Sequence, residues 1–109
     1  MGHYTDQAAV IAGPTSTTKA SVLANTAASV DLNSFAGTWV IIKSNVKTHY
    51  RFRSGATAVV TTNDIYMTAD FDYPFYIPAG GARRYISHKG AGTGGSIYIA
   101  GPCSDALDV

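Results

Sequence analysis

The sequence contains no glutamate and only one glutamine, Gln7, although both residue types are strong helix formers. Its seven acidic residues are therefore all aspartates. Threonine, valine, isoleucine, tyrosine and phenylalanine, which favour strands, are plentiful, and 11 glycines and 4 prolines can supply turns. The composition therefore predicts an all-β protein built from many short strands.

The chain also has little cysteine and little net charge. A single cysteine, Cys103, excludes an internal disulfide and is typical of a chain that folds in a reducing compartment. The net charge of +1 is far from the strong basic excess that dominates nucleic-acid binding. Seven of the eight basic residues lie in 43–53 and 83–89. We interpret them as the solvated sides of strands, with a single basic face on adjacent strands as the alternative.

Long apolar segments are missing as well. Residues 1–13 have neither a basic start nor a long apolar run, so we expect no signal peptide, and no stretch approaches the length of a membrane span. At 109 residues the chain predicts one folded domain, 20–109, preceded by an extended N-terminal arm, 1–19. The arm has too little apolar content to fold alone, so it is either a flexible tail or a segment that orders against a neighbour.

The stretch 73–100 sets the pattern for the rest of the chain. Residues 73–77 alternate between apolar and other side chains, which is typical of a strand with one buried face. Strands at 83–88 and 96–100 follow, with Ile97 and Ile99 expected on one buried face. Proline and glycine punctuate the chain between these strands, so we expect antiparallel hairpins at both turns.

The most hydrophobic run is 38–43, TWVIIK, which is apolar on both sides and predicts a central strand covered on two faces. We expect Trp39 to be the largest core anchor. The segment 46–53 is expected to pair with this strand as a hairpin, with Tyr50 and Phe52 inward. Shorter strands are expected around 20–24, 30–32, 58–60 and 65–67. The regular spacing predicts a single small antiparallel β-sandwich or barrel, jelly-roll-like, with the extended N-terminal arm.

Few residues in the sequence suggest chemistry. His3, His49 and His88 have no metal-ligand spacing, and we interpret the last two as surface histidines on the outer faces of strands. Cys103 lies in a polar tail without a nearby histidine, which favours an exposed, inert thiol over a nucleophile.

The aspartates and glycines are also interpreted as structural. Asp64, Asp70 and Asp72 form the one acidic cluster, and we expect them to cap turns, with a calcium site as the weaker alternative because the EF-hand pattern is incomplete. The glycine run 90–95 precedes a strand, whereas phosphate loops open a helix. With no triad, carboxylate pair or cofactor motif, the sequence predicts a protein that is not an enzyme and that holds no cofactor or metal.

Aromatic residues could form a stacking platform for nucleic acid or sugar, since the chain has seven tyrosines and four phenylalanines. Nucleic-acid binders interleave such rings with basic residues. In 49–53, however, alternation places the rings and the charges on opposite faces. This separation favours core aromatics.

The stretches ASVLANTAASVDL, GTWVIIKSNVKTHYRF and YPFYIPAGGARRYISHKGAGTGGSIYIA together resemble small β-barrel structural proteins of tailed bacteriophages. The resemblance covers residues 20–100 and includes the IPAG turn and the closing GSIYI strand. It implies a virion component that is assembled in the host bacterial cytoplasm. The kind most expected is a decoration (cement) protein or head-spike base on the capsid surface, often a homotrimer, whose partners are the major capsid protein and further copies of itself.

Such a protein acts through interfaces, so the resemblance transfers no functional residue. From the pattern we take Tyr66, Tyr76 and Tyr98 as interface candidates, because alternation places these rings opposite the buried isoleucines and methionine. In the arm, the candidates are Tyr4, Val10 and Ile11. The alternatives are a neck, tail or fibre-base virion protein and, from another class, a carbohydrate- or nucleic-acid-binding β-module.

Overall fold

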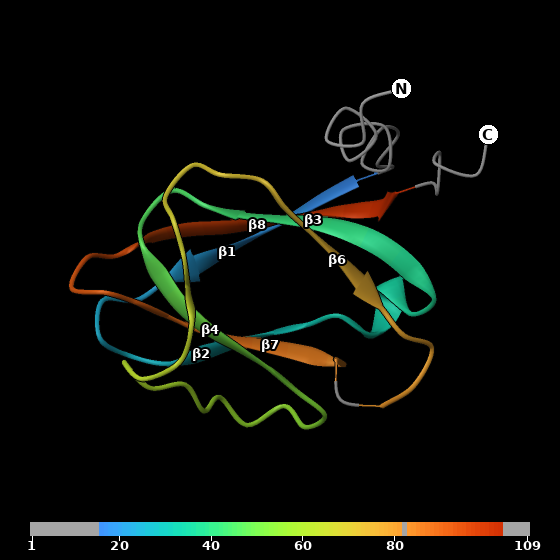
Figure 1. The fold of residues 1–109 in the computed structure, drawn as a ribbon, viewed down its shortest axis with the longest axis horizontal. Helices are drawn as coiled ribbons and strands as arrows, with labels where there is room; N and C mark the ends of the chain where they lie inside the picture. Colours follow the sequence, from blue (N-terminus) through green and yellow to red (C-terminus); the bar gives the residue numbers. More distant parts are fainter. Residues whose placement is uncertain (1–15, 82, 104–109) are drawn as a thin grey trace.

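The computed structural model describes residues 16–81 and 83–103, and these form two four-stranded antiparallel sheets packed face to face (Figure 1). This confirms the predicted all-β sandwich. The elements are β1 (Ser16–Val22), β2 (Ala28–Asp31), the short 3-10 turn η1 (Asn33–Phe35), β3 (Thr38–Ser44), β4 (Thr48–Arg53), β5 (Tyr66–Met67), β6 (Tyr73–Ile77), β7 (Tyr85–Gly90) and β8 (Gly95–Cys103).

The two sheets have the strand orders β1-β8-β3-β6, called the first sheet below, and β2-β7-β4-β5, the second sheet. Strand β1 pairs with β8, β2 with β7, β3 with β6 and β4 with β5. The first strand thus pairs with the last, the second with the second to last, and so on to the central pair β4 and β5. These four pairs are divided between the two sheets. This nested pairing is the topology of a jelly roll.

The prediction that consecutive strands pair as hairpins at 38–53 and within 73–100 is wrong. Strands β3 and β4 lie in different sheets, and so do β6 and β7, and β7 and β8. At the end of β7, Gly90 donates its N–H to the Leu23 carbonyl at 2.9 Å and accepts from Asn25 at 3.0 Å. The end of β7 thus bonds to the 23–25 loop and not to β8. The glycine run after β7 connects the second sheet to the first and does not form a hairpin.

The expected boundary of the arm falls inside a strand. Residues 16–19, which the composition assigns to the arm, pair with β8 as the first half of β1. The remainder of the arm, 1–15, lies outside the described residues.

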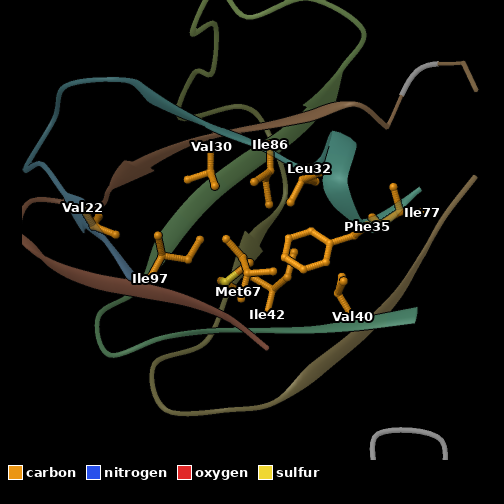
Figure 2. Packing of buried hydrophobic residues seen from close by; sticks show 11 residues of the cluster. Val22, Val30, Leu32, Phe35, Val40, Ile42, Met67, Ile77, Ile86 and Ile97 are labelled. Carbon is orange, nitrogen blue, oxygen red and sulfur yellow. The ribbon is translucent and has the colours of Figure 1, made fainter. Parts of the chain in front are cut away.

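The core lies between the sheets, and both contribute to it (Figure 2). On β3 and β8 every second side chain is buried, as the two-residue period of a strand requires. Ile97 and Ile99 are fully buried, as predicted. The buried cluster consists of Val22, Val30, Leu32, Phe35, Val40, Ile42, Met67, Ile77, Ile86, Ile97 and Ile99.

Aromatic side chains extend this core on one side. Tyr50 and Phe52 point inward from β4, as predicted, and pack with Phe75 of β6 at ring-centroid distances of 5.8 and 5.0 Å. The rings meet edge to face, an arrangement favoured by their charge distribution. Burial raises the pKa of the Tyr50 hydroxyl.

Trp39 is not a core anchor, contrary to the expectation. Val40 and Ile42 are fully buried, so strand alternation directs Trp39 and Ile41 to the outer face of the first sheet, where both are half-buried. When the side chains on both faces of a strand are apolar, the sequence does not indicate which face meets the core.

Cys103 and His88 are also buried, against expectation. Cys103 is the last residue of β8, which is longer than predicted, and burial raises the pKa of its thiol. His88 lies on the same side of β7 as the core residue Ile86 and is fully buried. Desolvation lowers the pKa of its imidazole.

The segment 54–65 covers the outer face of the second sheet and contains no strand at 58–60 (Figure 1). Val59 donates its N–H to the hydroxyl of Ser87 at 3.1 Å, and Val60 is buried. Ser87, which points outward from β7, is thereby fully buried.

The same segment explains why His49 is buried on the outer side of β4. Its Nδ1 lies 3.0 Å from the Asp64 carbonyl oxygen, and Arg51 forms an ion pair with the Asp64 carboxylate at 2.9 Å. The N–H of Thr61, more than Arg51, lowers the pKa of the Asp64 carboxyl. The loop therefore shields His49 and Ser87 on this face, whereas Arg51 stays partly exposed to solvent.

Candidate interaction face

The outer face of the first sheet carries an unusual number of apolar side chains. The outer face of a two-layer sandwich is ordinarily polar because it meets water. Here the face carries several apolar residues that are nevertheless half-buried or exposed. They are Trp39 and Ile41 of β3, Pro74 and Tyr76 of β6, and Tyr98 and Ala100 of β8.

One end of the face is an aromatic pair, Trp39 and Tyr76. The two residues are cross-strand partners, and their rings meet edge to face with centroids 5.7 Å apart. Tyr76 is 42% exposed, and Arg83 donates to its carbonyl oxygen at 3.1 Å. Trp and Tyr are enriched in protein interfaces because one ring buries a large area with few rotatable bonds.

The other end of the face is hollowed into a groove with a volume of about 460 Å³. Tyr98 lies in its floor between two lysines, because Lys19 of β1 and Lys43 of β3 are its cross-strand partners. The Lys19 ammonium is 5.9 Å from the centroid of the Tyr98 ring. The groove is lined by Thr17, Ile41, Lys43, Asn45, Asp70, Asp72, Tyr98 and Ala100.

The wall of the groove comes from the segment between β5 and β6. Asp70 adopts a left-handed backbone with φ of +60° and donates its N–H to the Ser44 carbonyl at 2.7 Å. Within residues 16–81 and 83–103, the side chains of Lys43, Asp70 and Asp72 have no hydrogen-bond or ion-pair partner. Charges of both signs therefore line the groove without neutralising each other in direct pairs.

The structure brings together some of the predicted interface residues. Tyr76 and Tyr98 lie on the outer face of the first sheet, whereas Tyr66 lies on β5 of the second sheet, 49% exposed, with the Lys47 ammonium 4.1 Å from its ring centroid. The other candidates, Tyr4, Val10 and Ile11, lie outside the described residues.

Sequence reasoning missed Trp39 and Ile41 as surface residues. The signal was present in the run TWVIIK, which predicts a strand covered on two faces. The described part of the chain buries only the Val40 and Ile42 side completely. The second cover that the pattern calls for can come from a partner.

The three aspartates considered for calcium do not converge. Asp64 is engaged with Arg51 beside the second sheet, whereas Asp70 and Asp72 line the groove on the first. Among the residues that the structure describes, no group of three or more His, Cys, Asp or Glu side chains is placed to hold a metal ion.

The described ranges contain no helix with the length and apolar content needed to cross a membrane. Comparison with known proteins finds no matching family model, no matching curated protein and no matching solved structure.

Proposed function

We infer that this protein is a structural component of a bacteriophage virion, namely a capsid decoration (cement) protein or head-spike base that binds and stabilises the shell. The observation that supports this most is the outer face of the first sheet. Its aromatic and aliphatic residues leave one side of a rigid sandwich suited to binding another protein. The jelly-roll topology adds support, because viral capsid proteins are among those that use it.

The proposed contact is centred on Trp39 and Tyr76. Their edge-to-face pair presents two rings on neighbouring strands, so both can enter one pocket of a partner. The partners are the major capsid protein and further copies of this chain, with a trimer as the expected oligomer. The proposal places the protein on the capsid surface and assigns it no reaction and no cofactor.

The test has two parts, of which the first is the copy number of this protein relative to the major shell protein in purified virions. A ratio near one to one is expected for a cement. A ratio of a few per hundred would instead favour a vertex, neck, tail or fibre-base position. Absence from the particles would contradict the proposal.

The second part locates the contact by rebinding purified variants to particles stripped of the protein. The double variant Trp39→Ser with Tyr76→Ser is expected to weaken binding at least about 30-fold, since each buried aromatic anchor at an interface contributes about 1–2 kcal/mol or more. Tyr66→Ser, which removes an exposed ring from the other sheet, is the matched control and should bind normally. Normal binding of the double variant would exclude the Trp39–Tyr76 pair as the contact.

A further inference from the structure

We propose that the groove on the outer face of the first sheet binds a neutral oligosaccharide. The groove lies at the end of the face away from the Trp39–Tyr76 pair and is formed by side chains of β1, β3 and β8 with the segment that leads into β6. This inference goes beyond the proposed structural role and does not depend on it.

The size and floor of the groove suit one or two sugar rings. Its volume of about 460 Å³ lies within the roughly 300–1,000 Å³ typical of small-molecule sites. The floor combines the Tyr98 ring with the aliphatic side chains of Ile41 and Ala100. Aromatic and aliphatic surface can pack against the C–H face of a pyranose, which excludes water from both.

The polar groups of the groove match the hydrogen bonding of hydroxyls. A hydroxyl both donates and accepts, so it needs acceptors and donors in the same site. The carboxylates of Asp70 and Asp72 can only accept, whereas the ammonium of Lys43 can only donate. None of the three charges has a partner within the described residues, so all are available to a ligand.

The charge balance favours a neutral ligand over an ion. Two carboxylates, Asp70 and Asp72, are matched by two ammonium groups, Lys43 in the groove and Lys19 beside the Tyr98 ring. The four charges sum to zero, so neither an anion nor a cation gains a net electrostatic attraction in the groove.

Two parts of the groove, the Asn45 amide and the backbone at Asp70, are held in place without a ligand. Asn45 accepts the Ser96 N–H with its Oδ1 at 2.8 Å, which fixes the amide plane and leaves Nδ2 as a donor. Asn45 can approach this closely because Gly95 has no Cβ, which would otherwise collide with Oδ1. The Asp70 N–H bond to the Ser44 carbonyl anchors the segment between β5 and β6 that lines the groove. A site formed in advance loses less entropy on binding.

The experiment uses saturation-transfer NMR and calorimetric titration of the full chain with maltotriose, cellotriose and N,N′,N″-triacetylchitotriose, three neutral probes that differ in linkage or substituents. We expect at least one of them to bind with a Kd on the order of 1 mM or tighter. Heparin-derived tetrasaccharide and trilysine serve as anionic and cationic probes. Binding of none of the neutral probes, or tighter binding of either charged probe, would overturn the proposal.

Variants then locate the bound sugar. Tyr98→Ala is expected to weaken binding about tenfold through loss of the ring, whereas Tyr98→Phe should retain it. Asp72→Asn, which keeps the shape and can still accept, is expected to weaken binding about threefold because a charged acceptor is the stronger one. Tyr66→Ala is the matched control on the other sheet. If Tyr98→Ala does not fold, Asp72→Asn decides: unchanged affinity in that variant places the sugar elsewhere and refutes the assignment.

Discussion

At the scale of single residues, His88 is the most unusual feature. It is fully buried between the sheets, and neither ring nitrogen has a hydrogen-bond partner among the described residues. Its cross-strand neighbours are Tyr50 on β4 and Ala28 on β2, and neither supplies a charge at neutral pH. The buried imidazole is therefore neutral, because protonation would place an unpaired charge in the core.

This burial predicts a loss of stability in mild acid. The pKa of His88 is lowered in the folded state, so below its ordinary value of 6.5 the unfolded chain binds the proton first. The free energy of unfolding should thus fall as the pH falls below about 6.5, by at most about 1.4 kcal/mol per pH unit for one proton, and level off below the folded-state pKa. Urea unfolding at pH 8, 6 and 5 measures this slope.

The control for this prediction is His88→Leu, which removes the titrating group and the unpartnered nitrogens together. The variant is expected to be at least as stable as the parent at pH 8 and to lose most of the slope between pH 6.5 and 5. The carboxyl pKa values of Asp31 and Asp64 are lowered from 3.8, by hydrogen bonds chiefly to Asn33 and Thr61 respectively, so their effects fall at more acidic pH. An unchanged slope in His88→Leu would assign the pH dependence to other groups.

At the scale of elements, strand β3 differs on its two faces. Val40 and Ile42 are fully buried in the core, whereas Trp39 and Ile41 are half-buried on the outside. Both faces are apolar, but only the inner one loses nearly all its contact with water within the described chain. How much each side chain of β3 contributes to the free energy of unfolding should therefore depend more on its face than on its size.

The two faces predict unequal mutational costs. Ile42→Ala should destabilise the protein by about 2–5 kcal/mol, because it removes buried volume and leaves a cavity. Trp39→Ala should cost only about 1 kcal/mol, since it removes a larger but half-buried ring at the surface. Denaturant melts of the two single variants compare these values. A loss of 3 kcal/mol or more for Trp39→Ala would place its ring among the core residues.

At the scale of the whole molecule, the jelly roll joins segments far apart in the sequence. Strand β1 pairs over its full seven residues with β8, near the other end of the described chain. Strand β8 is therefore an inner strand of the first sheet, with β1 on one side and β3 on the other. Without β1 it would become an edge, and the core residue Val22 would be lost with the strand.

Truncation should separate the arm from the fold. A chain that starts at Ser16 is expected to keep its β-sheet circular dichroism and its unfolding midpoint, because every described strand remains. A chain that starts at Leu23 lacks β1 and should be destabilised by several kcal/mol or fail to fold, as expected when a buried strand is removed. Loss of structure in the shorter truncation would show that residues 1–15 belong to the folded domain. If residues 1–15 contribute only to assembly, this truncation will lower the stability of the oligomer and leave the unfolding midpoint of the domain unchanged.

The sequence by itself determined the all-β class, the approximate strand positions and several inward-facing residues, among them Ile97, Ile99, Tyr50 and Phe52. These follow from composition and from a period of two residues, which are local properties of the chain.

Only the tertiary structure decided which strands pair, which face of β3 meets the core, and how segment 54–65 buries His49 and Ser87. It also placed Asn45, Asp70 and Tyr98 around one groove. Turns rich in glycine serve a hairpin and a crossing between sheets equally well, so local pattern cannot distinguish them. The choice depends on contacts such as β1 with β8, which form between distant segments once both sheets can close over a shared core.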